Sequence, residues 1–182
     1  DTSLFLYRQG NSFAAILVYV DDVFVATNDS FNLKALKGYL ASWFPIKDLS
    51  PLKYFLGLEV ARSSEGIVLS PRKYTLDILK ETGMLGSKPV KFPMEQHYRL
   101  ALDKSSPLQD LGPFRRLVGR LIYLSVTRPD ICYSVHLLSQ FMYQPRQNHW
   151  LAALRILRYL KLSPGQGIFP FNIKSFIYKR IL

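Results

Sequence analysis

Two adjacent carboxylates, Asp21 and Asp22, directly follow an apolar segment at residues 14–20. Residues 23–26 return to β-branched and aromatic side chains, so we expect two strands joined by a two-residue Asp-Asp turn. A rigid hairpin would hold both carboxylates at its tip, where their oxygens could bind a hard divalent cation such as Mg²⁺. The alternative is an ordinary acidic turn, since Asp tolerates the dihedral angles of tight turns.

The elements around this hairpin alternate between strand and helix patterns. Asp29 and Ser30 offer an N-cap to a helix that should end before Pro45. Residues 53–60 are typical of a strand with an interior glycine, Gly57, which indicates either a bulge, a close backbone approach or plain packing. Residues 63–66 then form a turn, and a partner strand follows it.

The second part of the chain has helical periodicity. Ser70-Pro71 should begin a helix that ends at Gly83, and residues 89–112 should form a long connection. Apolar stripes over residues 114–122, 131–142 and 150–157 predict three more helices. Six basic residues lie off these stripes: Arg115, Arg116, Arg120, Arg155, Arg158 and Lys161.

The net charge of +11 is unevenly distributed over the 182 residues. Residues 1–70 carry six Lys/Arg against seven Asp/Glu, whereas residues 71–182 carry eighteen against six. A one-sided excess of this size indicates a polyanionic partner, nucleic acid first and an anionic membrane surface as the competitor. Because the basic residues are interleaved with apolar ones, a folded basic face is favoured over a disordered arm.

Several other classes are disfavoured by composition. The hydrophobic content of 48% argues against disorder, and we find neither a membrane-length apolar run nor a secretory signal. The single Cys132 excludes an internal disulfide, and we expect it to be a small buried core residue. His97, His136 and His149 are far apart, so we interpret them as structural or surface residues.

In this order, the elements resemble the second half of a reverse transcriptase palm followed by its thumb, and more specifically the polymerase of copia-type retrotransposons. The blocks that carry the resemblance are Asp1–Phe5, Leu17–Asp22, Lys47–Val60, Arg115–Leu124, Thr127–Ile131 and Ile156–Lys161. It implies an α+β fold, with a partial palm containing the acidic hairpin and a second hairpin over residues 1–70. A basic, mainly helical thumb and connection would follow over residues 71–169. Residues 170–182 do not match and are expected to be a divergent tail outside the domain.

The resemblance implies an RNA-directed DNA polymerase in which two Mg²⁺ ions serve nucleotidyl transfer. Asp21 would be the metal ligand of the hairpin, with Asp22 in support and Tyr19 near the primer terminus. Lys47 would be the general acid that protonates pyrophosphate, or else a solvated loop lysine.

Binding roles follow from the same resemblance. The segment that would hold the primer end is Tyr54, Phe55, Leu56 and Gly57. The arginines that would grip duplex phosphates are Arg115, Arg116, Arg120, Arg155 and Arg158. The implied partners are an RNA template with its DNA primer and the remainder of the Pol polyprotein, with no membrane span. The implied location is the cytoplasm, within a virus-like particle, or the nucleus.

The family places another catalytic aspartate and the fingers upstream of the equivalent of Asp1. We therefore expect this stretch by itself to lack polymerase activity. A non-catalytic, basic nucleic-acid-binding remnant is the first alternative. A basic helical module bound to an anionic membrane or a protein partner is the second.

Overall fold

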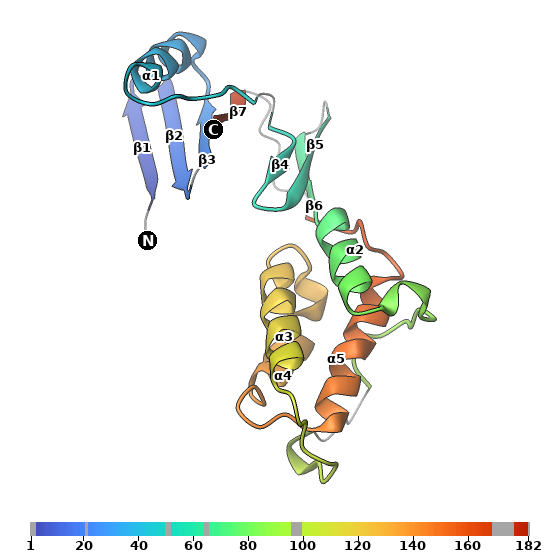
Figure 1. Ribbon diagram of the computed structural model, residues 1–182. Helices are drawn as coiled ribbons and strands as arrows, with labels where there is room; N and C mark the ends of the chain where they lie inside the picture. Colours follow the sequence, from blue (N-terminus) through green and yellow to red (C-terminus); the bar gives the residue numbers. More distant parts are fainter. Residues whose placement is uncertain are drawn as a thin grey trace. The chain divides into compact units, whose positions relative to one another are not determined.

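The computed structural model describes residues 3–20, 22–49, 52–63, 66–95, 100–168 and 177–181 (Figure 1). The chain forms two compact units. The first comprises Asp1–Phe55, Val60–Ile67 and Pro170–Leu182, and the second comprises Leu56–Glu59 and Val68–Phe169. Sheets dominate the first and helices the second, so the mixed α+β class is as predicted. The domain boundaries drawn from the sequence stay a prediction.

The first unit contains a four-stranded antiparallel sheet in the order β1-β2-β3-β7. Its strands are β1 (Leu4–Gln9), β2 (Ser12–Tyr19), β3 (Asp22–Thr27) and β7 (Ile177–Ile181). The apolar run before the acidic pair and the one after it therefore form the paired strands that their β-branched and apolar residues predict. β7 belongs to the stretch that the sequence sets apart as a tail, and it pairs with β3 from Val23↔Ile181 to Thr27↔Ile177.

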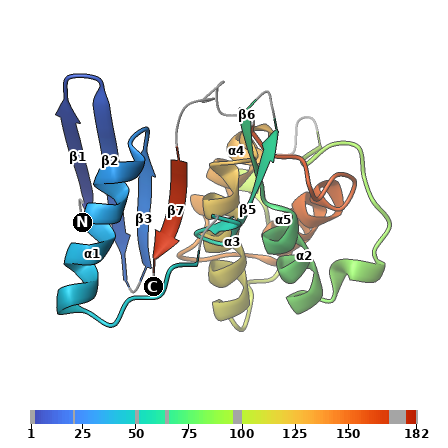
Figure 2. The ribbon, with the colours of Figure 1, turned by 90° about the horizontal axis from the view of Figure 1, so that it is seen from above.

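Helix α1 (Ser30–Trp43) lies across one face of this sheet (Figure 2). Asp29 is its N-cap, as predicted, and its carboxylate accepts the backbone N–H groups of Phe31 and Asn32. These two bonds satisfy amides that the first helical turn leaves open. Leu33 of α1 and Val25 of β3 form the buried centre of the contact.

The second sheet differs from the sequence prediction. Its strands are β4 (Tyr54–Phe55), β5 (Leu58–Ser63) and β6 (Gly66–Ser70), in the order β4-β5-β6. The single strand predicted over residues 53–60 is wrong, because Leu56 and Gly57 have φ angles of 48° and 84° and reverse the chain between β4 and β5. The positive φ of Gly57 is one that glycine adopts without strain.

The helices of the second unit are α2 (Arg72–Glu81), α3 (Gly112–Ser125), α4 (Cys132–Ser139) and α5 (Gln147–Leu160), and its three short 3₁₀ helices are Met84–Gly86, Leu100–Leu102 and Pro129–Ile131. On α3, Phe114, Val118 and Leu121 are fully buried, as their spacing predicts. Ile122, also predicted to face inward, is 45% exposed. Cys132 is exposed at the start of α4, against the prediction of a core position.

A buried histidine anchors the long connection to α5. His149 Nδ1 accepts the backbone N–H of Arg146 at 2.9 Å, and its Nε2 lies 3.1 Å from the carbonyl of Leu100. Its ring stacks on Phe141 with centroids 4.1 Å apart. The structural interpretation of this residue is therefore confirmed, while His97 lies outside the described residues.

Candidate functional site

The acidic turn ends a firmly paired hairpin. Tyr19, the last residue of β2, pairs with Asp22, which begins β3 instead of lying in the turn. Val20 has φ 52° and is 81% exposed. A β-branched residue is costly in this left-handed region, so the pairing of the two strands must hold it there. Asp21 lies outside the described residues.

The carboxylates around the turn fit a metal only in part. Asp22 is half-buried at the start of β3 and has an interaction partner. Over the described ranges, no three His, Cys, Asp or Glu side chains come together as a metal-binding group. The described residues thus do not make a complete metal centre by themselves, and an ion held at Asp22 would need further ligands.

One aromatic contact links the acidic hairpin to the proposed primer-holding segment. Phe24 of β3 is buried and meets Phe55 of β4 edge to face, with ring centroids 5.0 Å apart. Tyr54, the neighbour of Phe55, is partly exposed, and Tyr19 is exposed at the end of β2. Both phenol rings are thus accessible on the first unit. Lys47, the candidate general acid, is exposed in the segment after α1.

Within the second unit, the Leu56–Gly57 turn contacts helix α3. The Tyr123 hydroxyl on α3 donates a hydrogen bond to the carbonyl of Leu56. Sequence reasoning gave Tyr123 no role, although it falls in one of the family blocks. Its place in that block, three residues after Arg120 on α3, was the available signal.

The three arginines of α3 differ in their partners. Arg120 forms an ion pair with Glu81 of α2, and Arg115 donates through Nε to the carbonyl of Met142 at 2.8 Å. Arg116 is exposed, and the structure records no hydrogen bond or ion pair between it and any described residue. A guanidinium that faces a carboxylate is largely neutralised, whereas one that faces a carbonyl keeps its charge.

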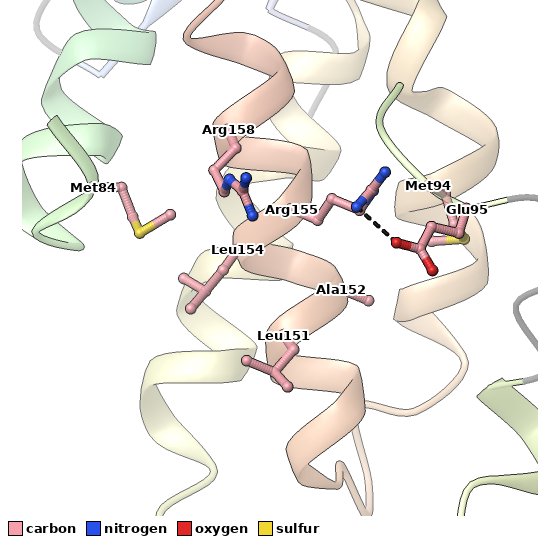
Figure 3. A pocket seen from close by; sticks show the side chains of 8 residues that line it. All are labelled: Met84, Met94, Glu95, Leu151, Ala152, Leu154, Arg155 and Arg158. Atoms are coloured by element: carbon pink, nitrogen blue, oxygen red, sulfur yellow. Dashed lines mark hydrogen bonds and ion pairs between the residues drawn. The ribbon is translucent and has the colours of Figure 1, made fainter. Parts of the chain in front are cut away.

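Arg155 and Arg158 of α5, together with its C-cap Lys161, bind the segment at residues 87–95. Arg155 Nη1 lies 2.8 Å from Glu95 Oε1, and Arg158 Nε donates to the carbonyl of Lys88 at 2.8 Å. Figure 3 shows Arg155 turned toward Glu95, with Arg158 beside it at the end of a groove of about 320 Å³. Lys161 Nζ donates to the carbonyl of Ser87 at 2.6 Å. The structure therefore gives these residues a structural task, and their contact with phosphate stays a prediction.

An ion pair between the buried Arg128 and the partly exposed Asp130 lies just before α4 and contacts α5. Arg128 is 1% exposed and grips Asp130 with two bonds, Nε to Oδ1 at 2.9 Å and Nη2 to Oδ2 at 2.7 Å. Its Nη1 donates to the carbonyl of Ser163 at 2.9 Å, and the Tyr159 hydroxyl donates to Asp130 Oδ2 at 2.7 Å. From sequence this stretch is only a helix start, because periodicity does not report burial of a charged residue.

This network sets the protonation of Asp130. Burial by itself would raise the pKa of Asp130, but the hydrogen bonds from Arg128 and Tyr159 outweigh it and hold the pKa below its ordinary value. The same hydrogen bond to the carboxylate, followed by burial, raises the pKa of Tyr159. Asp130 is therefore ionised at neutral pH in the folded protein.

Sequence comparison identifies the family that carries this arrangement. Residues 1–96 match the family described as reverse transcriptase (RNA-dependent DNA polymerase). The chain belongs to this reverse transcriptase family. No solved structure matches the chain significantly.

Homology to copia-type Pol polyproteins covers most of this reverse transcriptase chain. It is 46% identical over 169 residues to the Retrovirus-related Pol polyprotein from transposon RE2 of Arabidopsis thaliana, covering 93% of this chain and 12% of that protein. The Pol polyprotein from transposon TNT 1-94 of Nicotiana tabacum is 36% identical over 85% of this chain. The uncharacterized mitochondrial protein AtMg00810 of Arabidopsis thaliana is 36% identical, and the match covers 88% of this chain and 69% of that protein.

The chain thus corresponds to part of a reverse transcriptase domain of a retrotransposon Pol polyprotein and spans 12% of the first two polyproteins' length. Reverse transcriptases act on nucleic acids and generally use divalent metals. None of the helices within the described ranges has the length and apolar character needed to cross a bilayer.

Proposed function

We propose that this chain contributes part of the palm and the thumb to a copia-type reverse transcriptase, which copies RNA into DNA as part of the Pol polyprotein. The observation that carries the proposal is the acidic turn at residues 19–22. The Tyr19↔Asp22 pairing supports the proposal, because it closes an antiparallel hairpin within the region that matches the reverse transcriptase family.

The residues of the turn take distinct roles in this proposal. Asp21 and Asp22 contribute carboxylate ligands to the Mg²⁺ ions of nucleotidyl transfer, Asp21 directly and Asp22 in support. Tyr19 lies near the primer terminus, and its exposed position at the end of β2 supports this role. Lys47 is a general acid toward the leaving pyrophosphate, and its exposure supports access to that group.

The helical unit binds the primer–template duplex through phosphates in this proposal. The excess positive charge of residues 71–182 supports it, and Arg116, with its exposed guanidinium, is the foremost contact. The partners are the RNA template, the DNA primer and the rest of the Pol polyprotein. The protein works in a cytoplasmic virus-like particle or in the nucleus.

The test supplies the rest of the polymerase in trans. The full chain is mixed with the upstream reverse transcriptase region of the RE2 polyprotein, and nucleotide incorporation on a primed RNA template is measured with Mg²⁺. We expect incorporation by the mixture, none with Asp21→Asn and less with Asp22→Asn. Asp77→Asn, an exposed carboxylate on α2, is the matched control and should act as wild type. Equal incorporation by Asp21→Asn and wild type would remove the acidic turn from the site.

A second candidate is a basic nucleic-acid-binding protein without catalysis. The charge asymmetry favours it independently of the acidic turn, because phosphate binding needs no carboxylate. Salt-dependent duplex binding together with no incorporation in the reconstituted mixture would select it.

A further inference from the structure

The turn between β4 and β5 is conformationally costly. Leu56 and Gly57 both have positive φ angles, 48° and 84°. Two-residue hairpin turns of the primed type require this backbone, and glycine or asparagine is the usual choice at such positions. Leucine carries a Cβ that crowds the following carbonyl in the left-handed region. Something outside the turn must therefore hold Leu56 in place.

Tyr123 supplies that restraint. Its hydroxyl donates to the carbonyl oxygen of Leu56, and its ring lies 5.0 Å from the ring of Tyr74 at 60°. A Cβ built on Gly57 would stand 3.7 Å from Tyr74 Cδ2, so the Tyr74 ring lies beside the turn. The hydrogen bond and the ring contact thus act on neighbouring residues of the same turn.

The Tyr74 ring of this aromatic pair also contacts a cationic side chain. The Arg120 guanidinium lies 5.1 Å from the centroid of the Tyr74 ring and also forms an ion pair with Glu81. A cation over an aromatic face is attracted by the ring quadrupole. Tyr74 comes from α2 and Tyr123 from α3. The position of the turn therefore depends on two packed helices as well as on its own short strands.

We propose that Tyr123 is a positioning residue that holds the Leu56–Gly57 turn in its left-handed conformation. Gly57 is exposed, so its backbone is accessible to a ligand. The inference deepens and rests on the proposed function, in which this turn holds the primer end. Without the Tyr123 hydroxyl, Leu56 is free to relax toward negative φ, and the open backbone of Gly57 changes direction.

Amide exchange in the full chain tests the positioning directly. Val60 N–H donates to the carbonyl of Lys53 at 2.8 Å across the β4–β5 pair, so its exchange reports opening of this hairpin. Tyr123→Phe removes only the hydroxyl and should raise the Val60 exchange rate roughly three- to tenfold, the range that one hydrogen bond supports. Tyr133→Phe, on a 75% exposed tyrosine of α4, is the control and should leave it unchanged.

A rescue variant separates positioning from general loosening. Asparagine tolerates the left-handed region, so Leu56→Asn combined with Tyr123→Phe should return Val60 exchange to the wild-type rate. Unchanged exchange in Tyr123→Phe, or failure of this rescue, would overturn the positioning role.

A separate binding experiment tests the primer role. It compares the affinity for an RNA–DNA duplex with a recessed primer 3′ end with the affinity for a blunt duplex. We expect wild type to prefer the recessed end, Tyr123→Phe to lose roughly three- to tenfold of that preference, and the double variant to regain it. Equal wild-type affinity for both duplexes, with exchange behaving as expected, would overturn the primer-holding function and support the positioning.

Discussion

Replacing Asp130 by Asn should destabilise the helical unit, because Asp130 is the carboxylate that faces the buried Arg128. The change keeps the shape of the side chain but removes the charge that compensates Arg128, a guanidinium 1% exposed. Breaking a buried pair by removing one partner costs about 3–5 kcal/mol, because the remaining charge cannot be hydrated. The Asp130 side chain is itself 26% exposed, and the Asn oxygen still accepts one of the two Arg128 bonds, so we expect the lower end, about 3 kcal/mol.

Urea unfolding followed by tryptophan fluorescence measures this free energy. The chain has two tryptophans, Trp43 on α1 and Trp150 on α5. In a Trp43→Phe background, the remaining emission reports the second unit alone. With an m value of about 1–3 kcal/mol/M, the midpoint should fall by about 1–3 M at constant slope. Arg116→Gln, an exposed arginine on α3, is the control and should stay within about 0.5 kcal/mol of wild type.

A double variant tests the electrostatic reasoning itself. Arg128→Met removes the guanidinium, so adding Asp130→Asn to it leaves no buried charge to compensate. The two losses should therefore be clearly less than additive, by about 1 kcal/mol or more. A midpoint for Asp130→Asn within error of wild type, or strict additivity in the double variant, would refute the argument that the pair holds a buried charge.

Three further outcomes follow from the same contacts. The pKa of Asp130 is depressed in the folded state, so its contribution to stability is present above the ordinary pKa of 3.8 and is lost as the pH falls through the folded-state pKa. The difference in urea midpoint between wild type and Asp130→Asn should therefore shrink below about pH 4. Arg116→Gln should lower the slope of log duplex affinity against log salt by about 0.9, whereas Arg155→Gln should change it less, because Glu95 already faces that charge; equal changes in a titration by fluorescence anisotropy would contradict this. Deleting residues 177–182 should expose the outer edge of β3 and promote self-association, seen as a shift in light scattering; a chain that stays monomeric would show that this edge needs no cover.

Local elements could be predicted from the sequence wherever one residue pattern and one physical rule sufficed. The apolar strands around the acidic pair, the Asp29 cap and the buried stripe of α3 were predicted in this way and are present. The family was also recognisable, because six short blocks stand in a fixed order. Each of these features depends on neighbours within a few turns or strands.

Register and strand breaks were decided by tertiary pairing. Asp22 lies in β3 rather than in the turn, because Tyr19 is its partner across the hairpin. The strand predicted through Gly57 is instead a hairpin turn, supported by the distant Tyr123. Leucine is unfavourable in such a turn, so the residue types over residues 53–60 did not show that the chain reverses there.

The partners of the charged side chains were decided only by the tertiary structure. Side chains off an apolar stripe are correctly predicted to lie outside the hydrophobic core, but the sequence does not show which residues they contact. Arg155 meets Glu95 and Arg120 meets Glu81, each many residues away, whereas no described residue pairs with Arg116. Arg128 is buried because Asp130 and the carbonyl of Ser163 accept its guanidinium N–H groups, and the Tyr159 ring centroid lies 5.7 Å from it. Sequence sets the number and spacing of charges, and only the packed helices determine which of them stay available to a phosphate.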